Sequence, residues 1–233
     1  MKKIVFGILI GFLFVLGGCL DDGDYSLGDI YVGFGILEDA ETYKIVLDDG
    51  EILIPVAFNH TWDANDSRDG FQNGDRVLVN FTILDDNMNE GGDVTTYQVR
   101  INSLKEILMK GILDITPENE DSIGSDPIIV KDVWITNNLL NFKFKYWGQS
   151  QIHFINLVKQ PGSLAADDQP FELELRHNAN NDEESIPYTS FVSFKLDTLQ
   201  IMGLDSVMFK VTSTDYDGET FNYENVYKYG ENN

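Results

Sequence analysis

The chain has one cysteine, Cys19, and the residues before it indicate which modification its thiol receives. Two lysines at positions 2 and 3 precede an apolar run, residues 4–16, and two glycines at 17 and 18 stand directly before the thiol. Charge, an apolar stretch and a small-residue cleavage site are the three parts of a secretory signal. The apolar run of about 13 residues is too short for a membrane-spanning helix, which needs about 20. We therefore expect a cleaved signal rather than a transmembrane anchor.

Leu16-Gly17-Gly18-Cys19 resembles a bacterial lipobox, the pattern that directs lipid attachment to a cysteine thiol. In that pattern the thiol receives a diacylglyceryl group, and the signal peptide, residues 1–18, is then removed. Cys19 would become a lipidated N-terminus that holds the protein on a membrane, because each buried methylene contributes roughly 0.8 kcal/mol. The alternative is an ordinary secreted protein with one unused thiol, which would be free to pair between molecules.

The strong negative charge excludes one large class of partner. The chain carries 16 basic and 39 acidic residues and a formal net charge of −23. Nucleic acids are bound through basic patches, so we expect no nucleic-acid partner. Direct binding to anionic head groups is disfavoured for the same reason, and membrane attachment is expected to depend on the lipid at Cys19.

Arg176–Glu184, with the sequence RHNANNDEE, is the polar cluster best suited to ligand binding. It combines a guanidinium, an imidazole, amides and carboxylates, which could form a sugar or calcium site. A long turn whose asparagines and acids bond their own backbone is the alternative. Trp147 alternates with Lys143 and Lys145 and is expected on an outward face, where its ring could stack on a ligand. The residues proposed for ligand contact are Trp147, Arg176, His177, Asn178 and Asp182.

The chain shows no catalytic or metal-binding motif, and we expect no enzyme, no cofactor and no metal. The histidines, His60, His153 and His177, do not stand at ligand spacing, and each is expected to be structural. Nucleophile-elbow, P-loop and H-E-x-x-H motifs are all missing from the sequence. The stretch Asp63–Gly70 offers alternating oxygen ligands, but Arg68 occupies the position where a calcium-binding EF-hand loop requires glycine.

Alternation of apolar and polar residues, which is typical of strands, dominates the chain from Tyr43 onward. Asp48-Asp49-Gly50 predicts a hairpin turn, and Ile52, Ile54 and Val56 are expected to continue the apolar face of the hairpin. Residues 85–93 are predicted as a loop, and residues 105–113 fit either a fifth strand or a short helix. Five strands in about 70 residues suit a small closed barrel of the OB type.

The predicted domain organisation therefore begins with an acidic tether at residues 19–37 and an OB-type barrel at residues 38–113. Residues 114–126, which contain proline, glycine, serine and several acids, are expected to form a linker with one helical turn. About seven alternating segments in residues 127–233 predict an antiparallel β-sandwich. The fold class is all-β, with a barrel followed by a sandwich.

A family resemblance adds to this interpretation and covers nearly the whole mature chain. The segments NGDRVLVNFTILDD, SIGSDPIIVKDVWI and LELRHNANND, in this order after the lipobox, resemble the NigD-like lipoproteins. The resemblance implies an N-terminal OB-type domain, a C-terminal β-sandwich and an envelope location. The founding member of that family lies in a bacteriocin-associated gene cluster, which implies toxin handling or immunity. The family supplies no catalytic motif to carry over.

The function expected from these observations is that of a lipid-anchored, non-enzymatic binding protein for a protein or peptide ligand. Its expected place is the outer membrane, with the cell surface and the periplasmic face as alternatives. The two alternative functions are a glycan-binding surface lipoprotein and, less well supported, an envelope-polymer hydrolase with a pair of carboxylates.

Overall fold

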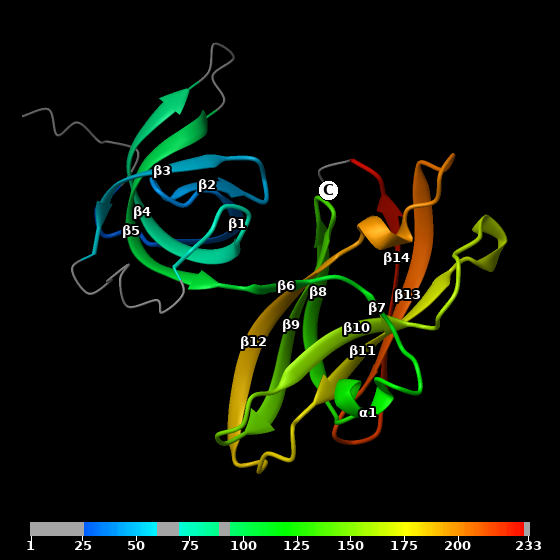
Figure 1. Ribbon diagram of the computed structural model, residues 1–233. Coiled ribbons are helices and arrows are strands. Elements are labelled where there is room, and N and C mark those ends of the chain that lie inside the picture. The colour runs from blue at the N-terminus through cyan, green and yellow to red at the C-terminus, as the bar shows by residue number, and fades with distance from the viewer. Residues whose placement is uncertain (1–25, 60–69, 89–93, 231–233) are drawn as a thin grey trace, which may run out of the picture.

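The protein consists of a β-barrel followed by a β-sandwich, so the expected all-β class and domain order agree with the structure (Figure 1). This computed structural model describes residues 26–59, 70–88 and 94–230. The expected signal peptide, Cys19, His60 and residues 63–69 lie outside the described residues. No helix within those ranges is both long and apolar enough to cross a membrane.

The barrel closes in the order β1-β2-β3-β5-β4, with β4 returning to pair with β1. Neighbouring strands are antiparallel except β3 and β5, which run parallel. Alternate residues of each strand point into the barrel and form its apolar core, which includes Val77, Val79 and Ile101. The strands are β1 (Tyr31–Asp39), β2 (Lys44–Leu47), β3 (Ile52–Phe58), β4 (Arg76–Met88) and β5 (Val94–Glu106).

The start of the barrel differs from the sequence expectation, because residues 31–37 form most of β1 and are not part of a tether. Glycines at two positions of this strand interrupt the apolar alternation and conceal it in the sequence. One of them, Gly35, is required by close packing, since a Cβ atom there would lie 2.6 Å from the carbonyl oxygen of Val46. The close approach of β1 to β2 explains why the strand carries glycine at this position.

The apolar face of β3 also differs from the expectation. Leu53 is fully buried, whereas Ile54 and Val56 are 41% and 55% exposed. Ile45 of β2 faces the core and pairs directly with Leu53, and residues paired across neighbouring strands share a face. The expected loop at residues 85–93 is shorter as well, because β4 continues to Met88.

The sandwich consists of a five-stranded sheet, β14-β13-β11-β10-β7, and a four-stranded sheet, β6-β12-β9-β8. Three of its strand pairs, β10–β7, β11–β13 and β12–β6, are parallel, and the other described pairs are antiparallel. The longer strands are β8 (Ile129–Thr136), β9 (Leu139–Gly148), β10 (Phe154–Lys159), β11 (Phe171–Asn178), β12 (Ile186–Lys195), β13 (Ser206–Thr214) and β14 (Thr220–Lys228).

The passage between the domains is more ordered than the expected linker. Residues 105–113 form neither a separate strand of the barrel nor a helix: the first two complete β5, which ends at Glu106, and β6 (Leu108–Lys110) already pairs with β12 of the sandwich. β7 (Leu113–Asp114) pairs with β10, and the expected helical turn is present as α1 (Glu120–Ile123). Short strands replace a free linker because the chain passes directly onto the edge of each sandwich sheet.

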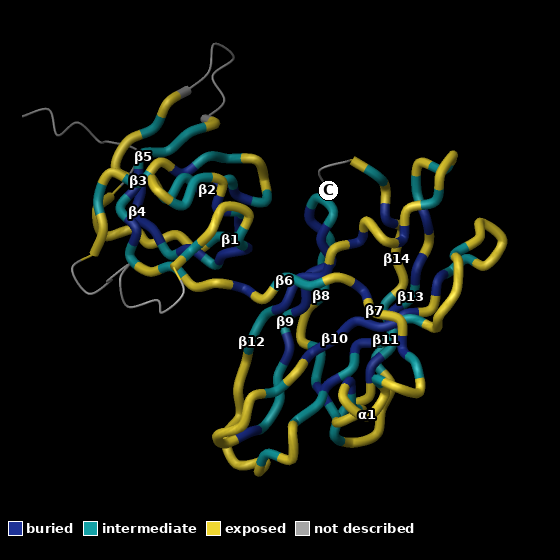
Figure 2. Tube along the Cα trace, viewed as in Figure 1, coloured by how far each residue is buried: buried dark blue, intermediate teal, exposed yellow. Residues whose placement is uncertain are grey.

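Buried residues form one apolar core in the barrel and another in the sandwich, and Figure 2 marks buried positions in dark blue along the chain. The sandwich core is rich in aromatic residues, as the alternation in the sequence predicts. Phe142 and Phe194 meet edge to face with their ring centroids 5.9 Å apart. This packing gives β9, β11 and β12 a fixed frame from which their ends project.

The barrel contacts the sandwich through an aromatic cluster. Phe34 of β1 lies with its ring centroid 5.4 Å from that of Trp134 on β8 and 5.0 Å from that of Phe191 on β12. The guanidinium of Arg76 lies 5.5 Å above the Phe34 ring. The two domains therefore meet across a packed contact as well as through the chain.

Arg76 is 1% exposed at this contact and has a polar partner in each domain. It donates two hydrogen bonds to the carboxylate of Asp48, which belongs to the barrel. It donates a third, at 3.2 Å, to Oδ1 of Asn141 on β9, and the same oxygen accepts the hydroxyl of Ser193 at 2.6 Å. Arg76 thus forms an ion pair within the barrel and joins the two domains through its hydrogen bond to Asn141.

Candidate functional site

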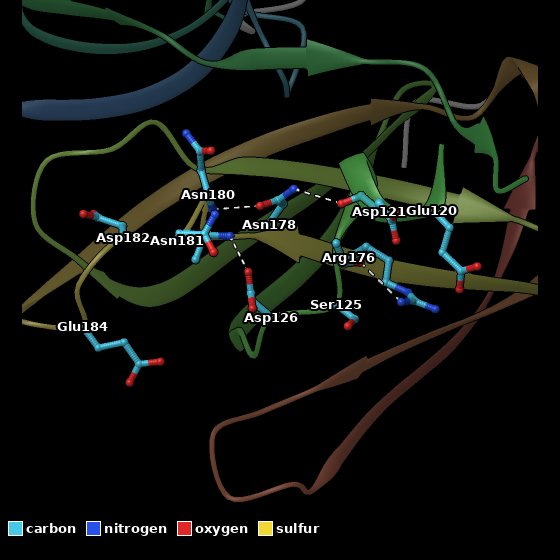
Figure 3. Close-up of a pocket in the computed structure, with 12 residues that line it drawn as sticks. Glu120, Asp121, Ser125, Asp126, Arg176, Asn178, Asn180, Asn181, Asp182 and Glu184 are labelled. Atoms are coloured by element: carbon cyan, nitrogen blue, oxygen red, sulfur yellow. Dashed lines mark hydrogen bonds between the residues drawn. The ribbon is translucent and has the colours of Figure 1, made fainter. Parts of the chain in front are cut away.

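A polar pocket of about 550 Å³ lies at the end of the sandwich, where α1 and the end of β11 come together (Figure 3). Its walls are α1, the segment that leads from α1 to β8, and the turn that follows β11. The residues that line it are Glu120, Asp121, Gly124, Ser125, Asp126, Arg176, Asn178, Ala179, Asn180, Asn181, Asp182 and Glu184.

The turn after β11 takes its shape from its asparagines. Asn180 and Asn181 have φ angles of 54° and 56°, in the left-handed region that asparagine tolerates better than most residues. The backbone N–H of Asn180 donates to Oδ1 of Asn178 at 2.7 Å. The expected bonding of the cluster to its own backbone is therefore present, and it forms the wall of a pocket.

Long-range hydrogen bonds hold this turn against α1 and the segment that follows the helix. Asn178 Nδ2 donates to the carbonyl oxygen of Ser122 at 2.8 Å, and the N–H of Ala179 donates to Asp126 Oδ2 at 2.6 Å. Gly124 has a φ of +74°, and a Cβ atom there would lie 2.6 Å from the Asn178 Cβ. Glycine alone fits this approach, so the helix and the turn form one preformed wall.

A chain of hydrogen bonds runs behind the pocket from one histidine to another and then to a carboxylate. His177 Nδ1 lies 2.9 Å from the carbonyl oxygen of Pro127, which can only accept, so Nδ1 carries a proton. His177 Nε2 lies 2.7 Å from His153 Nδ1, and His153 Nε2 lies 3.1 Å from Asp182 Oδ2. We call these three side chains, His177, His153 and Asp182, the histidine relay.

The protonation of the relay follows from its partners. Burial and the neighbouring His153 lower the pKa of His177, although the hydrogen bond to Pro127 and the charge of Asp126 partly oppose them. His177 is therefore neutral, and its unprotonated Nε2 accepts from His153 Nδ1. His153 Nε2 lies against the Asp182 carboxylate, which can only accept, so every bond of the closed relay is made when His153 donates from both ring nitrogens.

Asp182 is the carboxylate end of the relay and has a 4% exposed side chain. Burial alone would raise the pKa of Asp182. Hydrogen bonds from the backbone N–H groups of Gln149 at 2.5 Å and Ser150 at 3.1 Å, together with His153, outweigh it and hold that pKa well below 3.8. Asp182 thus joins the turn after β11 to the end of β9.

Tyr146 and Gly148 of β9 enclose the relay. The ring centroid of Tyr146 lies 4.5 Å from that of His153 and 5.5 Å from that of His177. A Cβ atom at Gly148 would lie 2.7 Å from His153 Nε2 and 2.8 Å from Asp182 Oδ2. The relay therefore has no room for a side chain at this position.

The charge of the pocket is mainly negative. Arg176 is the only cation among the lining residues. Its Nη1 donates to the carbonyl oxygen of Gly124 at 3.3 Å, and its Nε lies 2.8 Å from Glu174 Oε1. The lining carboxylates are Glu120, Asp121, Asp126, Asp182 and Glu184. Four of them, at positions 120, 121, 126 and 184, are exposed and could meet a cationic ligand.

The structure separates the residues proposed for ligand contact into three groups. Arg176, Asn178 and Asp182 line the pocket, whereas His177 is 1% exposed and lies behind it in the relay. Trp147 does not line the pocket: its ring meets that of Tyr216 at 4.7 Å, and Lys145 Nζ lies 4.3 Å from its centroid.

The site predicted from the sequence does not include α1 and residues 124–126, which form the other wall. These residues are separated from β11 by about 50 positions in the chain. The sequence offers only a weak signal for it, the acids and glycine of the expected linker. Within the described ranges, no group of three or more His, Cys, Asp and Glu residues is arranged to hold a metal ion.

Comparison with known proteins identifies both domains. Residues 35–107 match the NigD-like N-terminal OB domain, and residues 111–227 match the NigD-like C-terminal β-sandwich domain. A search of curated proteins gave no match.

Similar solved structures span the same two domains. A protein from Parabacteroides distasonis, proposed to be toxin-related, is 29% identical, with a TM-score of 0.67 over 86% of this chain and 94% of its own. A NigD-like immunity protein from Bacteroides caccae is 18% identical, with a TM-score of 0.64 over 88% and 98%. A protein from Bacteroides fragilis, proposed to be a lipoprotein, is 13% identical, with a TM-score of 0.59 over 87% and 99%. With its barrel and its sandwich both matched, the chain belongs to the NigD-like family.

Proposed function

We propose that this NigD-like protein is a lipid-anchored, non-enzymatic binding protein of the outer membrane, and that its sandwich pocket receives a basic group of a peptide or protein ligand. The main support for the proposal is the negative charge of a preformed pocket. Five carboxylates line it, while its one guanidinium already bonds within the protein. Fixed carboxylates of this kind attract a cation and orient it through charge-assisted hydrogen bonds.

The lining of the pocket favours a peptide over a glycan. Among the described residues that line it, none is aromatic, and sugar rings are commonly bound by stacking on such side chains. The amides of Asn180 and Asn181 are exposed beside the carboxylates and suit the backbone of a peptide. Trp147, which would be needed for stacking, is covered by Lys145 and Tyr216.

The names of similar proteins support the same kind of ligand and the same location. The relatives from P. distasonis and B. caccae are named for a toxin and for immunity, and the B. fragilis relative for lipid attachment. The barrel follows closely after Cys19 in the sequence, and α1, which lines the pocket, lies at the end of the sandwich remote from the barrel (Figure 1). An anchor at Cys19 would therefore leave the pocket accessible from the side away from the membrane.

We expect the double substitution Glu120→Gln, Glu184→Gln to weaken binding of a pentalysine peptide to the full chain. Both side chains are exposed and line the pocket, so the change removes charge at nearly constant shape. Exposed ion pairs contribute about 0.2–1 kcal/mol each, which corresponds to a loss of about 2- to 30-fold in affinity. Fluorescence anisotropy with labelled pentalysine, at low and moderate salt, measures the effect.

The matched control is Glu41→Gln, Glu224→Gln, which removes the same charge from exposed positions on the barrel and on β14. We expect the control to change the affinity by less than about twofold, because screening weakens distant charges. Equal losses in the two double variants would show that pentalysine responds only to net charge, and the pocket would not be the binding site. Binding of neutral oligosaccharides on a glycan array, with no pentalysine binding, would favour the glycan alternative.

A further inference from the structure

The histidine relay connects the wall of the pocket to a group that can take up a proton. Asp182 lines the pocket, His153 bonds to Asp182, and His177 bonds to His153. Within the described residues, none of these three side chains belongs to a group that could hold a metal ion, and the proposed function gives none of them a role in a reaction. The relay instead holds the turn after β11 in place, because its carboxylate also accepts the backbone N–H groups of Gln149 and Ser150.

We propose that uptake of one proton by His177 opens the turn that forms the pocket, so that mild acid releases the ligand. This inference rests on the proposed function for its ligand, but the opening of the turn can be measured without one.

Hydrogen-bond geometry explains why a protonated His177 does not fit the closed relay. Its Nδ1 already donates to Pro127, so the added proton must sit on Nε2. That nitrogen lies 2.7 Å from His153 Nδ1, which also carries a proton, and two donors cannot share this distance. Two positively charged imidazole rings would also stand with their centroids 5.0 Å apart. Either His177 or His153 must then move.

The other titratable groups around His177 do not remove the conflict. Asp126, from the segment before β8, attracts the new charge, but its carboxylate already accepts the N–H of Ala179. Tyr146 of β9 packs against both rings at tilted angles, and burial raises its pKa, so it stays uncharged in mild acid. Tyr188 of β12 stacks in turn on Tyr146.

Movement of His153 would release the pocket wall. Asp182 would lose its imidazole partner, and its bonds to the backbone N–H groups of Gln149 and Ser150 would open more often. Asp182 itself remains ionised in mild acid, since its pKa lies well below 3.8. The turn between Asn178 and Asp182 would then be held at one end only, and the carboxylates of the pocket would no longer converge.

The direction of the pH effect follows from linkage. His177 has a lowered pKa in the closed form, whereas in an open, solvated form it would approach its usual 6.5. The closed form is therefore favoured above pH 6.5 and is lost as the pH falls below that value. The equilibrium constant for opening increases by about tenfold for each pH unit below 6.5, until the pH passes the pKa of the closed form.

The test combines two measurements on the full chain in detergent between pH 7.5 and 5. Nitrogen-15 NMR of the three histidines reports tautomers, and hydrogen exchange, corrected for its intrinsic pH dependence, reports the amides of Gln149 and Ser150, which donate to Asp182. We expect an Nδ1-protonated neutral His177 at pH 7.5 and loss of amide protection as it gains a proton below pH 6.5. Titration of His177 at or above pH 6.5, or unchanged amide protection down to pH 5, would overturn the proposal.

The variant His177→Gln separates proton uptake from other effects of acid, because glutamine offers an oxygen to His153 but does not titrate. We expect its amide protection and its pentalysine binding to stay unchanged from pH 7.5 to 5.5, where carboxyl groups in general remain ionised. If this variant does not fold, the wild-type titration still decides.

The two proposals can fail separately. Opening of the turn without pentalysine binding at any pH would refute the proposed function alone. Pentalysine binding that is unaffected by pH, with the turn closed, would refute the relay alone.

Discussion

Replacing Arg76 with methionine is expected to lower the free energy of unfolding by about 3 kcal/mol, because it leaves the Asp48 carboxylate without its partner. The guanidinium is fully buried, and the Asp48 side chain is 21% exposed, so water can compensate for only part of the loss. Asn141 loses a donor at the same time. Urea unfolding followed by tryptophan fluorescence measures the effect, since Trp134 lies in the same contact.

Two further variants identify the cause of that loss. Arg100→Met removes the same side chain from a half-exposed part of the barrel, where its hydrogen bonds to Asn102 and Thr82 are longer than 3 Å, and should cost only about 1 kcal/mol. The double variant Arg76→Met, Asp48→Leu should recover part of the stability, because no charge remains buried. If Arg76→Met and Arg100→Met cost the same, Arg76 does not join the domains as described.

The substitution Cys19→Ala should transfer the protein from the membrane fraction to the soluble fraction. Two long acyl chains contribute well over about 10 kcal/mol to membrane attachment, so nearly all of the wild-type protein should sediment with membranes. Leu20→Ala, which keeps the thiol, serves as the control. A Cys19→Ala protein that still sediments with membranes would contradict the lipid anchor. Protease treatment of intact wild-type cells is a separate measurement, which distinguishes a protein on the cell surface from one in the periplasm.

Alternation in the sequence predicted most of the fold, and the exceptions have local causes. Strands such as β11, with Phe171, Leu173 and Leu175 on one face, bury what their pattern indicates. The pattern did not predict β1, because glycines stand at positions where the alternation requires apolar side chains. The face of β3 was misjudged because the length of the turn after Leu47, and hence the pairing of Ile45 with Leu53, was not determined by composition.

The candidate site was only partly predictable, because it depends on which strands become neighbours. The turn at Asn178–Asp182 could be recognised from its residue types, but its contact with α1 could not. The pairing of Ile155 with His177 brings His153 diagonally opposite His177, and this register follows from the whole sheet rather than from local sequence. Two histidines predicted to be structural thus form one relay with a carboxylate, which their spacing in the sequence conceals.

The central claim is that the sandwich pocket holds a peptide or protein ligand, and site-specific crosslinking on intact cells tests it most directly. A photoreactive p-benzoylphenylalanine at Asn180, an exposed residue that lines the pocket, should form an adduct that pentalysine suppresses. The same group at Glu224 on β14 should form none. The adduct should be lost in Glu120→Gln, Glu184→Gln but not in Glu41→Gln, Glu224→Gln. Equal adducts from positions 180 and 224, or none that pentalysine suppresses, would contradict the account.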